Sequence, residues 1–270
     1  MSVRTTTAHP ESWARPRALL LAFGVVFVAL GIAPHDRAAW ALENVLVIVA
    51  LAMFVATRHR LRFSNLSYTL LFAFFVVHEV GAHYTYARVP WAQWLAAASG
   101  GWLQVSADVR NDYDRVIHFA YGLLVLRPAV ELLDYAAPPR GVWRWLMPPL
   151  FILSHAGIYE QLEWAATAVF STGLGSTYLG SQGDPWDSEW DVLMAVIGAL
   201  VALAIMAFAE ARGHSLLELA FSWLLAHGPV ASVIAGATKP EQIRANVGAA
   251  AWQLTHADLA AINAILDRPR

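Results

Sequence analysis

The sequence contains no cysteine, little charge and a single lysine. The absence of cysteine excludes disulfides, Cys-ligated zinc, iron–sulfur clusters and thiol nucleophiles, so any bound metal would have to be held by His, Asp and Glu. Only 14% of the 270 residues are charged, the formal net charge is −2, and no tract of five basic residues occurs. A nucleic-acid partner is therefore not expected.

Apolar side chains dominate instead, at 58% of the residues, and the mean hydropathy is +0.48. A helix needs about 17 to 25 predominantly apolar residues to cross a hydrocarbon core of ~30 Å. Runs of this kind cover residues 17–33, 40–57, 66–82, 116–133, 142–170 and 192–209. The sequence therefore predicts an all-α, polytopic transmembrane helical bundle of about six spans, embedded in a lipid bilayer.

Basic residues in the connections predict the orientation of this bundle. With the N-terminus in the cytoplasm, nine arginines lie on the cytoplasmic side and four on the outer side. Because cytoplasmic loops carry the excess of basic residues, both termini are expected in the cytoplasm, as in a multi-pass protein of a bacterial inner (plasma) membrane. The sequence does not indicate an oligomeric state.

The last part of the chain has a different pattern. After residue 212 we expect an amphipathic helix over 214–227, a strand-like apolar run over 230–235, a helix over 240–251 and a final helix after Thr255. The predicted organisation is a cytoplasmic segment 1–16, a transmembrane domain 17–212 and a short α/β-type soluble tail 213–270.

Ionisable residues inside the predicted spans gather near their outer ends. Each such group costs about 2.5 to 3.5 kcal/mol at the centre of a bilayer, so their placement carries functional information. Four pairs lie one helical turn apart and therefore share a helix face: Glu79 with His83, Asp114 with His118, Glu160 with Glu163, and Asp187 with Asp191. We expect these faces to meet in one outward-facing pocket.

Carboxylates combined with histidines are typical ligands of a divalent cation. The candidate metal ligands are His118, Asp114, Asp187, Asp191, His83 and Glu79. Glu160 and Glu163 are the candidate catalytic acid or base, in a metal-assisted membrane hydrolase or transferase. The zinc-protease helix motif is excluded, because it needs histidines four residues apart and His78 and His83 are five apart.

Two other interpretations of the polar residues remain open. They can act as interhelical hydrogen bonds in a non-catalytic scaffold, or as the relay of a proton- or ion-coupled transporter. The predicted inner halves of the spans hold few ionisable groups apart from Arg127 and Glu131, and this disfavours conduction across the membrane.

Three segments carry a family resemblance. Residues 111–119 (NDYDRVIHF), 159–164 (YEQLEW) and 182–187 (QGDPWD) resemble the YjdF-like inner-membrane proteins of bacteria and, more distantly, VanZ-like proteins. The resemblance covers about residues 33–209 and implies a membrane fold and an envelope role without a defined reaction. A divalent cation or a polar lipid-linked group is the expected ligand of the pocket.

The tail resembles the C-terminal end of an aldo/keto reductase barrel over residues 214–246. By this resemblance, the positions that hold the NADP phosphate and adenine in that family are Gly236, Lys239, Gln242 and Asn246. The strands that carry the catalytic tetrad of the family are absent, because the chain before residue 213 is predicted to form membrane helices. A barrel needs all eight strands, so the four positions are expected to be vestigial and NADP is not an expected cofactor.

Purified protein is therefore expected to oxidise NADPH no faster than a heat-denatured sample when carbonyl substrates are added. The measurement is the loss of NADPH absorbance. Oxidation that requires the carbonyl compound and is abolished by Lys239→Ala would contradict the prediction.

Overall fold

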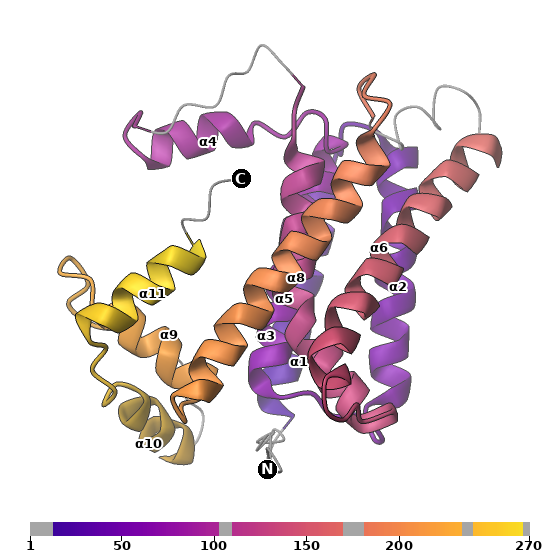
Figure 1. The fold of residues 1–270 in the computed structure, drawn as a ribbon. Coiled ribbons are helices and arrows are strands. Elements are labelled where there is room, and N and C mark those ends of the chain that lie inside the picture. The colour runs from indigo at the N-terminus through magenta and orange to yellow at the C-terminus, as the bar shows by residue number, and fades with distance from the viewer. Residues whose placement is uncertain (1–12, 103–109, 170–180, 234–239, 267–270) are drawn as a thin grey trace. The chain divides into compact units, whose positions relative to one another are not determined.

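The computed structural model describes residues 13–102, 110–169, 181–233 and 240–266, and these residues contain helices but no strand. Figure 1 shows the helices in chain order. They are α1 (Ala14–Gly31), α2 (Arg37–Thr57), α3 (Asn65–Tyr84), α4 (Trp91–Ala98), α5 (Tyr113–Ala136), α6 (Trp143–Val169), α8 (Asp187–Ala211), α9 (Leu216–Leu225), α10 (Pro240–Ala249) and α11 (His256–Leu266). The predicted all-α architecture is confirmed.

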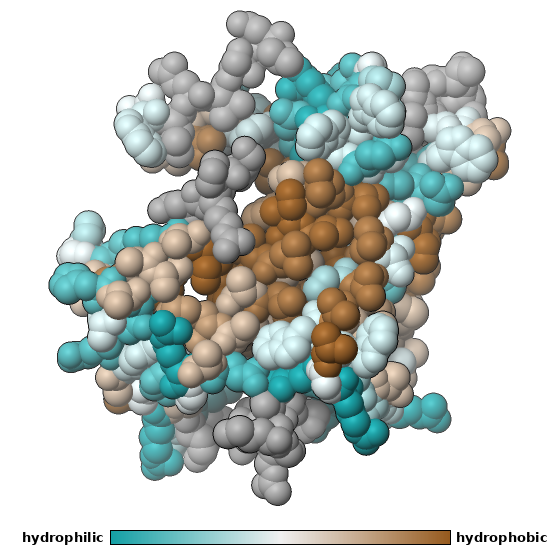
Figure 2. All heavy atoms as spheres, in the orientation of Figure 1, coloured by the Kyte–Doolittle hydropathy of each residue, from teal (hydrophilic) through white to brown (hydrophobic). Residues whose placement is uncertain are grey.

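Five of the long helices (α1, α2, α3, α5 and α8) are long and apolar enough to cross a membrane. The remaining predicted span, α6, has 27 residues and packs against α5 but is not among these five helices. Figure 2 shows apolar side chains over the middle of the long helices and hydrophilic residues toward their ends, as expected for a bundle surrounded by lipid.

The chain divides into two compact units, residues 1–199 and 200–270. In the first unit α1, α2 and α5 all pack against α3, and α6 packs against α5 (Figure 1). A cluster of buried side chains from three of these helices, Phe23, Val47, Leu71 and Phe75, forms an apolar core. Helix α3 therefore occupies the centre of the packing.

Side-chain caps fix where two of the spans begin. The Asp36 carboxylate accepts hydrogen bonds from the Ala38 and Ala39 backbone N–H groups, at 2.8 and 3.0 Å, and starts α2. The Ser64 hydroxyl accepts one from Ser67 N–H at 3.1 Å and starts α3. Each cap satisfies N–H groups that have no partner inside the helix.

Helices α5 and α8 approach each other closely because each carries a glycine at the contact. A Cβ atom on Gly122 would lie 1.9 Å from the Ala195 carbonyl oxygen, and one on Gly198 would lie 2.1 Å from the Phe119 carbonyl oxygen. Only residues without a side chain permit this backbone contact, which is the usual way in which membrane helices pack tightly.

The second unit is a small helical assembly. Its core contains Phe208, Ala209, Leu219 and Ile262, and a capping box between Ser215 and Glu218 starts α9. The expected tail helices are present as α9, α10 and α11. The expected strand is not formed over the described residues 230–233, because a single strand in this tail has no neighbour to complete its backbone hydrogen bonds; residues 234–235 lie outside the described residues.

Replacing Gly122 with alanine should separate α5 from α8 and destabilise the protein by about 1 to 3 kcal/mol, because the added methyl group overlaps backbone atoms. The matched control is Gly157→Ala in α6, where nothing lies within 4 Å of the new Cβ and alanine favours the helix. The measurement is thermal unfolding in detergent. Equal melting temperatures for the two variants would contradict the close contact.

Candidate functional site

Three helices of the first unit bring a histidine and two carboxylates together. His118 of α5, Glu160 of α6 and Asp191 of α8 are buried, and one ligand atom from each lies within 4.8 Å of the others. His118 Nε2 is 3.4 Å from Glu160 Oε1. Glu160 Oε1 and Asp191 Oδ1 have no hydrogen-bond partner among the described residues, so both are available to a cation. We call these three residues the α5–α6–α8 triad.

A second group, Asp114, Asp187 and Asp191, also has one oxygen each within 4.8 Å of the others. Here a cation is already supplied by the chain, because Arg110 donates from Nη2 to both Asp114 and Asp187. Burial alone would lower the pKa of Arg110, but these two carboxylates raise it above its ordinary value. Asp191 belongs to both groups and therefore connects the triad to the aspartates that pair with Arg110.

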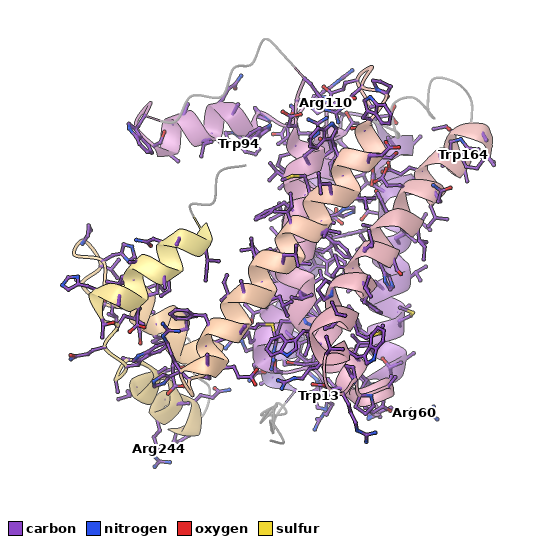
Figure 3. The ribbon with its side chains drawn as sticks, in the orientation of Figure 1. Trp13, Arg60, Trp94, Arg110, Trp164 and Arg244 are labelled. Carbon is purple, nitrogen blue, oxygen red and sulfur yellow. The ribbon has the colours of Figure 1, made fainter. Side chains whose placement is uncertain are left out.

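Loop contacts hold Arg110 in place. Its Nη1 donates to the Ser181 carbonyl at 2.5 Å. The adjacent Asn111 exchanges two hydrogen bonds with Gln182: Asn111 N–H donates to Oε1 at 3.0 Å, and Gln182 Nε2 donates to the Asn111 carbonyl at 2.8 Å. The segments that precede α5 and α8 are therefore tied together at the end of the bundle where Figure 3 labels Arg110.

A second ion pair reinforces this junction. Arg115 Nη2 donates to Asp184 Oδ2 at 2.5 Å. The pKa of Asp184 is lowered, first by the hydrogen bond from the Trp186 backbone N–H and then by Arg115. The carboxylate of Asp184 therefore stays ionised at neutral pH and keeps the loop before α8 attached to α5.

Two hydrogen bonds involving tyrosines extend the polar region toward α2 and α3. Tyr159 donates to Glu43 Oε2 at 3.1 Å and so connects α6 to α2. Tyr86 OH lies 2.6 Å from His78 Nδ1. Burial raises the pKa of Tyr86 well above its ordinary value, so the phenol stays protonated and shares a hydrogen bond with the His78 ring.

The turn after α3 brings Tyr86 back over its own helix. Thr85 adopts a left-handed conformation, φ 57°, and Tyr86 N–H donates to the Gly81 carbonyl at 2.8 Å. A Cβ on Gly81 would lie 2.5 Å from the Tyr86 ring. The glycine therefore leaves the space that the ring needs to reach His78.

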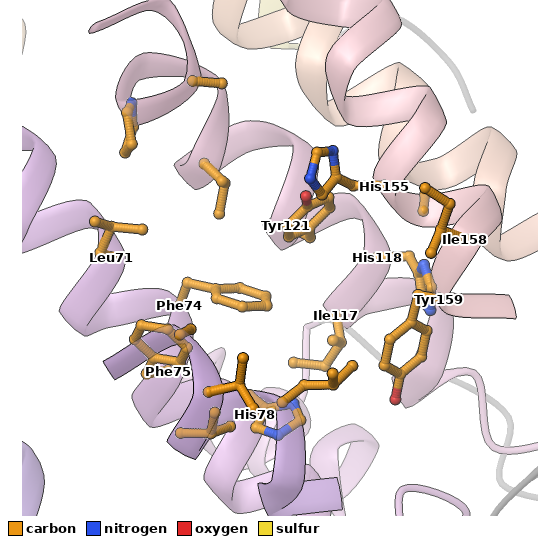
Figure 4. A pocket seen from close by; sticks show the side chains of 18 of the residues that line it. Leu71, Phe74, Phe75, His78, Ile117, His118, Tyr121, His155, Ile158 and Tyr159 are labelled. Atoms are coloured by element: carbon orange, nitrogen blue, oxygen red, sulfur yellow. The ribbon is translucent and has the colours of Figure 1, made fainter. Parts of the chain in front are cut away.

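The polar residues border a cavity of about 450 Å³ between α2, α3, α5 and α6. Figure 4 shows His78, His118 and Tyr159 among its lining side chains, together with Phe74, Phe75 and Ile117. Glu43, Glu163 and Asp191 also line it. One end of the cavity is thus polar and its walls are apolar.

The structure does not bring two of the predicted metal ligands, Glu79 and His83, into this site. His83 Nδ1 lies 2.7 Å from the Leu30 carbonyl of α1. Glu79 is fully buried beside Trp40 and Asn44 of α2. Helical spacing correctly places both residues on one face of α3, but that face packs against α1 and α2 rather than α5.

The remaining predicted site residues lie in two parts of the chain, the polar end of the bundle and the tail. Asp114, His118, Glu160, Asp187 and Asp191 come together as described, and Glu163 lies one turn beyond Glu160 at the cavity. In the tail, Gln242 and Asn246 lie one turn apart on α10, whereas Gly236 and Lys239 lie outside the described residues.

Sequence reasoning missed Arg110 and Tyr86. Arg110 precedes Asp114 by four residues, and this i, i+4 spacing would have predicted an ion pair between them. No pattern indicated Tyr86, since its approach to His78 depends on the reversal of the chain at Thr85.

Fold and site together define an integral helical membrane protein with a buried polar cluster at one end. The chain belongs to a family of predicted membrane proteins, DUF2238, whose model matches residues 15–212. It is 33% identical over 190 residues to the inner membrane protein YjdF of Escherichia coli (strain K12), covering 69% of this chain and 86% of that protein. The expected membership of the YjdF-like family is confirmed.

The tail gives a separate match. The aldo/keto reductase family model matches residues 184–267, which extends further toward the N-terminus than the resemblance seen in the sequence. No solved structure matches the chain.

Removing the guanidinium with Arg110→Met should destabilise the protein by about 3 kcal/mol, because Asp114 and Asp187 would be left buried without a counter-ion. Stability is measured by thermal and denaturant unfolding in detergent. The double variant Arg110→Met/Asp187→Asn should recover part of the loss.

The matched control is Arg88→Met, at an exposed position, where a change within about 0.5 kcal/mol is expected. If Arg88→Met and Arg110→Met had the same effect, the buried ion pairs would not stabilise this end of the bundle.

Proposed function

We propose that this protein is a bacterial inner-membrane protein that binds a divalent metal cation at the α5–α6–α8 triad. The observation that carries the proposal is the convergence of three buried donors from three different helices, with two carboxylate oxygens left without hydrogen-bond partners. One imidazole nitrogen and two carboxylate oxygens form a donor set that suits zinc, manganese or iron.

The charge balance supports the same conclusion. The carboxyl groups at the polar end are Glu43, Asp114, Glu160, Glu163, Asp187 and Asp191, and within this set Arg110 pairs with Asp114 and Asp187. Carboxylates buried in a low-dielectric region must be protonated or must bind a cation. A divalent ion at the triad would neutralise Glu160 and Asp191, the members of the set nearest to an imidazole.

A metal at the triad would leave Glu163 uncoordinated but close to it. In an enzymatic form of this proposal, a bound metal would supply Lewis-acid activation of water, and Glu163 would be the residue placed to accept the proton. With the N-terminus in the cytoplasm, this end of the bundle would face outward, which agrees with a role in the cell envelope.

The alternative of an ion-conducting transporter has less support. In the opposite half of the bundle, Arg127 pairs with Glu131 at 3.2 Å, and Glu131 Oε2 accepts a hydrogen bond from Ser64 N–H at 2.7 Å. These groups fasten α5 to the start of α3 and so have a structural role. A passive scaffold, the other alternative, gives no reason for a cavity at the polar residues.

Metal content is the direct test. Protein purified without chelators is expected to contain about one divalent metal ion per chain by elemental analysis. His118→Ala and Glu160→Gln should each lower the occupancy at least ~10-fold, since a ligand is lost. Glu160→Gln should not destabilise the metal-free protein, because it removes a buried charge without changing the shape of the side chain.

His155→Ala provides the matched control, because His155 lines the cavity but lies outside the triad; its metal content should equal that of the wild type. The proposal fails if wild-type protein binds no metal even after titration with Zn²⁺ or Mn²⁺, or if His118→Ala binds as much as the wild type.

A further inference from the structure

The cavity extends well beyond the polar residues. Along α2 its lining runs from Glu43 to Phe54, which is about 17 Å at 1.5 Å per residue. That length is close to one leaflet of a hydrocarbon core of ~30 Å. Away from the polar end the walls are aliphatic and aromatic, with Leu71, Phe75 and Val125 among the lining residues. The shape is that of a narrow apolar channel with a polar end.

The cavity is open at the surface of the bundle, between α2 and α6. Leu46, Val49 and Met53 of α2 line it and are also exposed, Met53 by 57%. Across from them, Ile158 and Leu162 of α6 line it and are exposed as well, Ile158 by 57%. A side chain that borders the cavity and also faces outward marks an opening. Because α2 is apolar enough to span a membrane, this opening faces lipid chains rather than water.

The polar end has a definite chemical preference. No arginine or lysine is found among the described residues that line the cavity, whereas Glu43, Glu163 and Asp191 contribute carboxyl groups. Among these lining residues an anionic head group would find no basic side chain as a counter-ion, whereas a hydroxyl group can exchange hydrogen bonds with the carboxyl groups. His78 also lines this end of the cavity, where its Nδ1 lies 2.6 Å from Tyr86 OH.

We propose that the cavity takes up a long-chain amphiphile with an uncharged hydroxyl head group directly from the bilayer, through the opening between α2 and α6. The alkyl chain lies along the apolar walls. The hydroxyl group forms hydrogen bonds with the carboxyl groups at the polar end. Asp191 lies at both sites, whereas Glu43 and Glu163 line the cavity and take no part in the triad, so uptake of the amphiphile does not require the metal.

Photolabelling tests the proposal. The probe is hexadecanol with a diazirine in the middle of its chain, added to the full-length protein in lipid nanodiscs, and the labelled residues are identified by mass spectrometry. Label is expected on Leu46, Val49 and Met53 at least ~5-fold above Val45 and Ile48, which are exposed on α2 but do not line the cavity. Excess hexadecanol should remove the label, and hexadecanoate at neutral pH should not.

Two variants fill the cavity from different walls, Ala50→Trp in α2 and Ala156→Leu in α6, and each should reduce the labelling several-fold. Val45→Trp is the matched control and should label like the wild type. Equal labelling of Val45 and Met53, unchanged labelling in both filled variants, or competition by hexadecanoate as strong as that by hexadecanol would overturn the proposal. Glu160→Gln, at a triad residue that is not among those lining the cavity, should lose metal but keep the labelling, so failure of the metal site and failure of the lipid site are distinguishable.

Discussion

Burial of several carboxyl groups beside very few cations is the constraint on which the rest of this structure depends. A single guanidinium, that of Arg110, reaches two aspartates at the ends of α5 and α8. An arginine outside the spans can reach them only if the two loops meet, and the paired hydrogen bonds of Asn111 and Gln182 hold them together. The loops before α5 and α8 are therefore held in the conformation that brings the Arg110 guanidinium to both aspartates.

Helix packing fixes the relative positions of the side chains at the polar end of the bundle. The glycines at 122 and 198 let α5 and α8 touch through their backbones, which fixes His118 relative to Asp191. Near the opposite end of the bundle, the hydrogen bond from Ser64 N–H to Glu131 connects the start of α3 to α5. Helix α5 is therefore attached to its neighbours near both of its ends. Helix α6 contributes Glu160 to the triad and Tyr159 to the bond with Glu43. Apolar side chains of α2 and α6, among them Met53 and Ile158, line the cavity and are exposed at the surface.

Much of the fold could be predicted from the sequence, because lengths of apolar runs and capping residues are local properties. The helices begin and end within a few residues of the predicted spans, and Asp36 and Ser64 explain two of the starts. The prediction of a strand after α9 was wrong over the described residues 230–233. A strand needs a neighbouring strand for its backbone hydrogen bonds, and a local sequence pattern cannot show whether one is present. Helix α6 is not among the five helices that are long and apolar enough to cross a membrane, yet it packs against α5 within the bundle.

For the candidate site, spacing in the sequence determined which side chains share a helix face, and Asp187 and Asp191 lie in one group, whereas Asp114 and His118 lie in two neighbouring groups. Only the tertiary structure decided which way each face points. The face of α3 that bears Glu79 and His83 turns toward α1 and α2, while the faces of α5, α6 and α8 turn toward one another. The physical reason is that helical periodicity fixes angles within one helix, whereas the rotation of a helix about its axis is set by contacts with its neighbours, here by the glycines and by Arg110.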